Sequence, residues 1–149
     1  MIIDAQLQYS AAQAVTATAA STNSIDHGPL KNNLGRNLGV GEELYLVITL
    51  VTAMTDAGSD STVTVTLETD DNSAFSSATV TRTLGVFAAL AAAGTRIVYK
   101  LAPGDINEQY SQLRYTVANG NLSTGAFTAQ IVKNPDGLYQ SYKDNITIS

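Results

Sequence analysis

The sequence contains no cysteine and no tryptophan, and it has a single histidine among 149 residues. The absence of cysteine excludes a disulfide framework, a thiolate zinc site and a cysteine nucleophile. One histidine, His27, excludes a metal site built on a histidine pair and leaves little side-chain chemistry for general-base catalysis. We therefore expect that the protein is not an enzyme and that it needs no cofactor.

Charged residues are also scarce. Only 14% of the residues are charged, against about 25% in ordinary soluble domains. The 8 Lys and Arg residues are scattered singly along the chain, and the formal net charge is −5. Because proteins bind nucleic acids chiefly through clustered cations, we expect no nucleic-acid partner. Threonine, serine, asparagine and glutamine supply the missing polarity.

Long apolar runs are lacking as well. The longest, residues 44–51, is far shorter than the roughly 20 residues of a membrane-spanning helix. The start of the chain, residues 1–6, has no basic stretch followed by an apolar run, which is the mark of a secretory signal. We expect a protein that is made in the cytoplasm and has no membrane partner.

The sequence does contain apolar residues that recur with a period of two, the pattern of half-buried β-strands. In residues 62–67, three apolar side chains alternate with three threonines, whereas residues 44–51 are apolar on both faces and predict a central or covered strand. Strands are predicted at 14–19, 24–27, 44–51, 62–67, 79–84, 96–101, 112–117 and 127–131. One short helix is predicted at 87–93, ending at Gly94. The prediction is one all-β domain, residues 1–149: a sandwich or jelly roll of about eight antiparallel strands with long loops and an extended C-terminal tail.

Two irregular segments carry the candidate contact residues. The loop 28–41 presents leucines on an asparagine-rich stretch, and exposed leucines on a long loop favour burial against a partner. The C-terminal arm, 134–149, carries tyrosines, which are enriched at interfaces, although this arm could instead cover its own sandwich. The candidate contacts are Leu30, Leu34, Arg36, Leu38, Tyr139 and Tyr142. Within the predicted strands, Arg82, Arg96 and Arg114 are expected on solvated sheet faces or at subunit contacts.

Other motifs fit a structural role better than a chemical one. The glycines in 35–41 precede a strand and not the helix that a phosphate loop needs. Acids in turns, such as Asp56 and Asp70, lack the spacing of a calcium loop and are predicted to accept local backbone hydrogen bonds, with a bound cation as the alternative. His27 is predicted to be a turn or edge residue, since no motif places a serine and an acid beside it.

Stretches spread along almost the whole chain carry a resemblance to a known family. They are residues 1–8, 10–16, 26–28, 38–42, 58–62, 68–72, 88–90, 94–96, 115–122 and 146–149. Together they resemble the capsid cement, or decoration, proteins of tailed bacteriophages, of the type found in the short-tailed Bordetella phage group. That family offers no catalytic residues to transfer to this sequence.

The resemblance implies a jelly-roll sandwich on the exterior of an icosahedral head, where it bridges neighbouring subunits of a major capsid protein with the Johnson fold. It also implies a homo-oligomer, with a dimer preferred and a trimer possible. The six candidate contacts then become candidate capsid contacts, and threonine-rich outward faces become surfaces that neighbours cover. Open sheet edges could also accept a neighbour's strand. The alternative function is a carbohydrate- or receptor-binding sandwich of a phage tail or fibre, against which the scarcity of aromatic residues counts.

Overall fold

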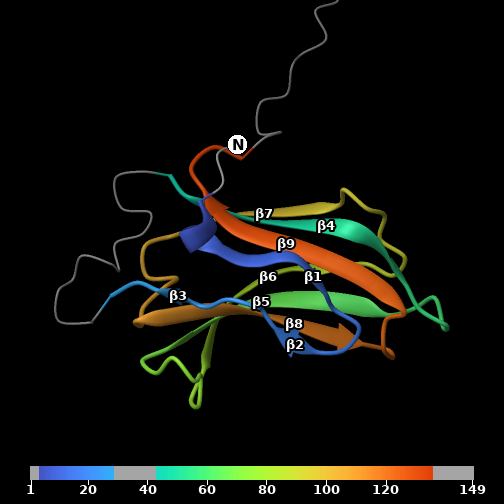
Figure 1. Cartoon of the computed structure of the whole chain (residues 1–149), viewed down its shortest axis with the longest axis horizontal. Coiled ribbons are helices and arrows are strands. Elements are labelled where there is room, and N and C mark those ends of the chain that lie inside the picture. The colour runs from blue at the N-terminus through green and yellow to red at the C-terminus, as the bar shows by residue number, and fades with distance from the viewer. Residues whose placement is uncertain (1–3, 29–42, 136–149) are drawn as a thin grey trace, which may run out of the picture.

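Two sheets of antiparallel strands lie face to face in the computed structural model, which describes residues 4–28 and 43–135 (Figure 1). A 3-10 turn, η1 (Ala5–Leu7), precedes the first strand. The strands are β1 (Gln8–Ala14), β2 (Ala19–Ala20), β3 (Ile25–Asp26), β4 (Tyr45–Thr55), β5 (Thr62–Asp70), β6 (Thr79–Phe87), β7 (Arg96–Lys100), β8 (Tyr110–Ala118) and β9 (Thr124–Val132). Sheet A has the order β1-β9-β4-β7. Sheet B has the order β2-β8-β5-β6, with β3 also paired to β8.

The strand order is that of a jelly roll. Since β2 and β3 both pair with β8, they act as one interrupted strand, which leaves eight strands. The first of these pairs with the eighth, the second with the seventh, the third with the sixth and the fourth with the fifth. Such nesting is a long hairpin rolled up so that successive pairs alternate between the two sheets. The predicted all-β jelly-roll sandwich is confirmed.

The predicted alternation is confirmed most clearly in β5. Val63, Val65 and Leu67 are completely buried, whereas the threonines between them are only half-buried on the opposite face. Strand β4 lies between β9 and β7, and it buries both Ile48 on the core side and Val47 on the outer side. The prediction that residues 44–51 form a central strand therefore holds, and both of its faces are covered at Val47 and Ile48, whereas Val51 at its end is 47% accessible.

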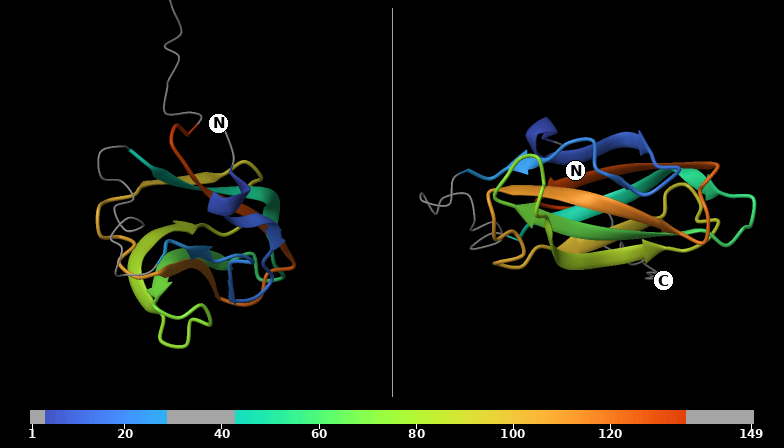
Figure 2. Two further views of the ribbon diagram at one scale, coloured as in Figure 1. Left: turned by 60° about the vertical axis from the view of Figure 1, so that its left-hand side comes forward. Right: turned by 90° about the horizontal axis from the view of Figure 1, so that it is seen from below.

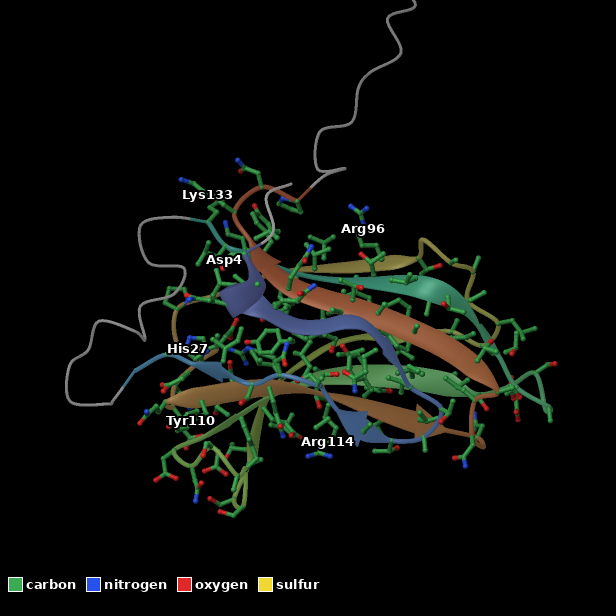
Figure 3. All side chains as sticks on the ribbon, viewed as in Figure 1. Asp4, His27, Arg96, Tyr110, Arg114 and Lys133 are labelled. Carbon is green, nitrogen blue, oxygen red and sulfur yellow. The ribbon has the colours of Figure 1, made fainter. Side chains whose placement is uncertain are left out.

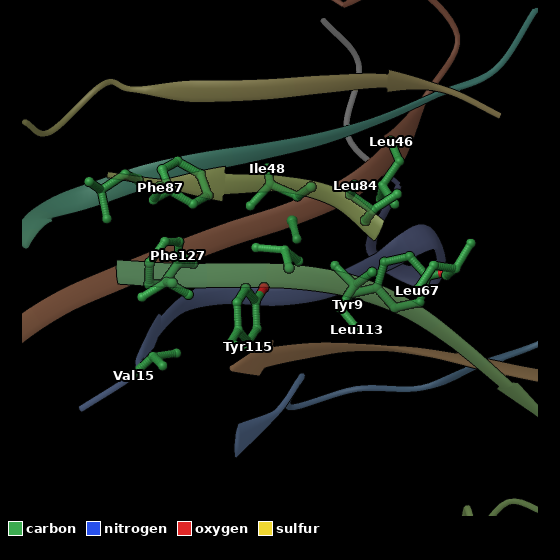
Figure 4. Packing of buried hydrophobic residues seen from close by; sticks show 14 of the residues in the cluster. Tyr9, Val15, Leu46, Ile48, Leu67, Leu84, Phe87, Leu113, Tyr115 and Phe127 are labelled. Carbon is green, nitrogen blue, oxygen red and sulfur yellow. The ribbon is translucent and has the colours of Figure 1, made fainter. Parts of the chain in front are cut away.

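Aromatic side chains from both sheets meet in the core (Figure 4). The ring of Phe127 in sheet A lies 5.1 Å from the ring of Phe87 in an edge-to-face contact. It stacks at the same distance on Tyr115 in sheet B. Such pairs contribute about 1 kcal/mol each beyond their buried area. This cluster holds the two sheets together near the centre of the sandwich.

Polar bonds between the sheets reinforce the apolar core. The hydroxyl of Tyr9 in β1 lies 2.7 Å from the hydroxyl of Ser111 in β8. The hydroxyl of Ser10 lies 2.9 Å from that of Tyr115. All four residues are buried, so burial without these partners would cost about 1–3 kcal/mol for each group. The relative position of the sheets is therefore fixed by specific bonds as well as by packing.

The helix predicted at 87–93 is wrong. Strand β6 continues to Phe87, and the following residues form turns in which Leu90 has a left-handed φ of 55°. The backbone groups of this alanine-rich stretch bond to β4 instead: the Met54 amide donates to the carbonyl of Ala91 and the Gly94 amide to that of Leu50. Tertiary hydrogen bonds thus override a weak local preference for helix.

Among the described residues, no helix is long and apolar enough to cross a membrane.

The strand predicted at 14–19 is misplaced. The chain pairs at 8–14 and again only at 19–20. The register of β1 against β9 shifts twice, and Ala12 has a left-handed φ of 48°. These irregularities place both Tyr9 and Ser10 in the interior, so β1 lacks the period of two by which strands are recognised.

Candidate docking face on sheet B

The outer face of sheet B, turned away from sheet A, carries three cross-strand rows of side chains. Directly opposed residues of antiparallel strands share a face, so the register of β6, β5 and β8 fixes these rows. The rows are Val80–Glu68–Gln112, Thr83–Thr66–Arg114 and Val86–Thr64–Thr116. We call these nine residues the sheet B face. The view from below in Figure 2 looks onto it.

Threonine and valine dominate the sheet B face. Its two valines are the most exposed large apolar residues described, with 54% of Val80 and 56% of Val86 accessible. Its four threonines are half-buried or exposed. Its only charged residues, Glu68 and Arg114, form an ion pair with each other. A surface with exposed apolar groups, an arginine and no lysine is typical of the centre of a protein interface.

The outer face of sheet A is different. Its edge strand β7 presents Arg96 and Lys100 opposite Thr49 and Tyr45 of β4. Lys100 pairs with Glu43 in an ion pair whose two side chains are both exposed. Exposed pairs of this kind contribute little to stability and are typical of a solvated surface. The two outer faces therefore differ in their charged residues, although the outer face of sheet A also exposes a valine, Val98, which is 39% accessible.

A buried carboxylate holds Arg114 in place. Glu68 Oε1 accepts a hydrogen bond from Arg114 Nε at 2.6 Å, and Glu68 Oε2 accepts one from Gln112 Nε2 at 2.8 Å. Only 6% of the Glu68 side chain is accessible, against 37% of the Arg114 side chain. Figure 3 shows Arg114 on the side of sheet B that faces away from sheet A. Because Glu68 occupies Nε, the two Nη groups are left to donate to a further acceptor.

The β5–β6 connection, residues 71–78, projects from sheet B away from sheet A (Figure 1, yellow-green). Asp70 organises it: one carboxylate oxygen accepts from the Asn72 amide at 3.0 Å, and the other accepts from the Ser77 amide at 2.8 Å. Burial acts to raise the pKa of Asp70, but these hydrogen bonds outweigh it and lower that pKa. Asp56 likewise accepts from the Ser61 amide in the β4–β5 turn. The prediction that these acids accept local backbone hydrogen bonds is confirmed.

The edge strand β6 is irregular. Its register against β5 shifts around Leu84 and again around Thr81. These shifts explain why Leu84 is buried while Val80 is exposed, although the alternation predicts that the two share a face. Bulges and short edge strands discourage the addition of further strands. The edge strand of sheet A next to β6 is β7, and it has only 5 residues. The geometry disfavours strand addition here and favours contact through side chains.

His27 lies directly after β3, as predicted for a turn or edge residue. Its Nε2 is 2.6 Å from the hydroxyl of Ser111, which also bonds to Tyr9. Burial lowers the pKa of His27 to about 4, against a smaller opposing effect of the neighbouring Asp26 carboxylate. Ser111 is completely buried, so its hydroxyl joins strands and has no exposed face to offer a substrate. The three residues form a structural link between β1, β3 and β8.

The six contact residues predicted from the sequence all lie outside the described residues. They are Leu30, Leu34, Arg36, Leu38, Tyr139 and Tyr142. Of the strand arginines, Arg114 lies on the sheet B face and Arg96 on the outer face of sheet A. Arg82 instead bonds to the buried Asp105 at 2.6 Å. Within residues 4–28 and 43–135, no group of three or more His, Asp or Glu side chains could hold a metal ion.

Fold and surface together define a class of protein: a jelly-roll sandwich whose distinctive feature is a threonine- and valine-rich sheet face. The sequence model of the Bbp16 family matches residues 9–131, from β1 into β9. The chain belongs to the Bbp16 family, which takes its name from a Bordetella phage protein. This confirms a relationship to a Bordetella phage protein. No curated protein matches the chain.

Proposed function

We propose that this protein is a structural virion protein that cements the head of a tailed phage. In this role it binds the outer surface of the shell, bridges subunits of a major capsid protein with the Johnson fold, and acts as a homo-oligomer, with a dimer preferred. The observation that carries the proposal is the sheet B face, a surface of a rigid sandwich that exposes valines and whose two charged residues pair with each other. The family relationship to a Bordetella phage protein supports it.

The physical properties of the chain suit this role. Many identical copies on a symmetric shell act together, so each contact can be modest. Bonds such as Tyr9–Ser111 and Ser10–Tyr115 keep the two sheets in one arrangement. The absence of cysteine makes the protein insensitive to the redox change between a cell and its surroundings.

The proposal is tested with expanded heads assembled without this protein. We expect the purified full-length chain to sediment with such heads in a saturable manner and to raise the temperature at which they break open. If folded protein does not bind heads at any concentration, the proposal is wrong. Binding of the free chain to glycans, without binding to heads, would instead favour a receptor-binding sandwich of a tail or fibre.

A further inference from the structure

We propose that the sheet B face is the surface with which this protein docks on the shell, and that Arg114 receives a carboxylate of the shell protein there. This inference rests on the proposed function and adds to it the face that binds and the chemistry of its partner. The partner surface presents an aspartate or glutamate side chain among small and apolar side chains.

The chemistry of Arg114 defines the acceptor. Its Nε is bound to Glu68, and Glu68 is held in turn by Gln112. Because the guanidinium is already ordered, binding a partner does not carry the entropy cost of ordering it. Within the described residues, Glu68 is the only hydrogen-bonding partner of the Arg114 side chain. The free Nη groups match the two oxygens of a carboxylate, which arginine binds in a bidentate manner. Thr66 and Thr116 lie beside Arg114 and can bond to neighbouring polar groups of the partner.

The surroundings of Arg114 favour a protein partner that excludes water. Val80 and Val86 lie at the β6 side of the face and expose more than half of their surface. Burying them supplies a hydrophobic contribution, and the exclusion of water strengthens the bond between a guanidinium and a carboxylate. The projecting 71–78 connection borders the face at the Val80 end and limits how a partner can approach it.

A second copy of this chain fits the face less well. With strands about 4.8 Å apart and rows about 6.8 Å apart, the nine residues cover on the order of 300 Å². A stable pairwise interface needs about 800 Å² from each partner. A symmetric contact would also place Arg114 against a face whose only carboxylate, Glu68, is buried and already bonded. A small face is sufficient on a shell where many copies bind together. The Arg114 guanidinium, which finds no acceptor on a second copy, then binds a carboxylate of the shell protein.

The first test uses matched valines on the two outer faces. Val86→Lys changes the sheet B face, and Val98→Lys changes the outer face of sheet A, where Val98 is 39% accessible. We expect Val86→Lys to weaken binding to expanded heads at least 10-fold, and Val98→Lys to change it less than 2-fold, with both variants as folded as the wild-type chain. The reverse order would overturn the assignment of the face while leaving the cement function standing. Failure of the wild-type chain to bind would overturn the function itself.

The second test concerns Arg114. We expect Arg114→Gln to weaken binding about 10-fold and to remove part of its dependence on salt, while Arg114→Lys binds at an intermediate level because it keeps the charge and loses the bidentate fork. Arg96→Gln, on the other outer face, serves as the control and should bind like the wild-type chain. Equal effects of Arg114→Gln and Arg96→Gln would contradict the role of Arg114. A change in the solution mass of Val86→Lys or Arg114→Gln would instead assign the face to contacts between copies of this chain and overturn the proposal.

Discussion

At the scale of single residues, two side chains, the half-buried His27 and the buried Asp105, connect parts of the chain that lie far apart in the sequence. His27 bonds to Ser111, 84 positions away. Asp105 accepts from Arg82 Nε, from the Tyr99 hydroxyl at 3.0 Å and from the Ala102 amide at 2.8 Å. The His27 link depends on one protonation state of the imidazole, because a polar group withdrawn from water that loses its partner is costly.

His27 predicts a dependence of stability on pH. Burial lowers its pKa to about 4 in the folded protein, below the value of 6.5 in an unfolded chain. As the pH falls through 6.5, the unfolded chain therefore binds a proton that the folded protein does not, so stability is lost between about pH 6.5 and pH 4. We expect the free energy of unfolding in urea to fall by roughly 1–2 kcal/mol between pH 7 and pH 5, after allowance for solvent screening. In His27→Gln most of this change should disappear, and an equal change in the variant would contradict the assignment.

Asp105 predicts a large effect of one substitution. Its carboxylate is fully buried and accepts three hydrogen bonds that join β6, β7 and the turn after β7. We expect Asp105→Ala to lower the free energy of unfolding by about 2–3 kcal/mol. The exposed Asp60 provides the control, since Asp60→Ala should change stability by less than about 0.5 kcal/mol. Similar losses in the two variants would show that the bonds to Asp105 are not important for stability.

At the scale of elements, β6 and β7 approach each other where the two sheets end. A Cβ atom added at Gly85 in β6 would lie 2.9 Å from Cδ1 of Ile97 in β7, which is closer than carbon atoms pack. Glycine at this position therefore allows the side chain of Ile97 to fill the gap between the sheets.

The contact predicts a coupling between these two positions. We expect Gly85→Val to lower the free energy of unfolding by about 1–3 kcal/mol, because the added methyl groups collide with Ile97. In a background that carries Ile97→Ala, the same substitution should cost at least about 1 kcal/mol less. A double-mutant cycle measured by chemical unfolding decides the matter, and additive effects would count against the proposed packing.

The elements also differ in how far the sequence predicts them. Strands β4 and β5 are predictable because their apolar residues match the pleat without interruption. Strand β1 and the outward position of Val80 are not, because they depend on bulges that form only when β9 and β5 are in place. The threonines of β5 and the arginine of β8 on the sheet B face follow from alternation. The bond between Glu68 and Gln112 does not, because it joins strands 44 residues apart.

At the scale of the whole molecule, a rigid sandwich presents two outer faces of different composition. The face of sheet A carries Arg96, Lys100 and an exposed ion pair, as expected for a surface in contact with water, together with the partly exposed Val98. The face of sheet B carries threonines, two exposed valines and one oriented arginine. The uncharged polar residues that replace charge in this sequence are prominent on the sheet B face, where four of the nine residues are threonines, and that side is the proposed contact with the shell.

The most direct test of this account is a reconstruction of heads that carry the protein. We expect density for a two-layered sandwich outside the shell, with β5, β6 and β8 facing the capsid subunits and Arg114 next to an acidic side chain of the shell. Sheet A facing the shell would contradict the docking face. Heads without any such density, in the presence of saturating folded protein, would contradict the cement function.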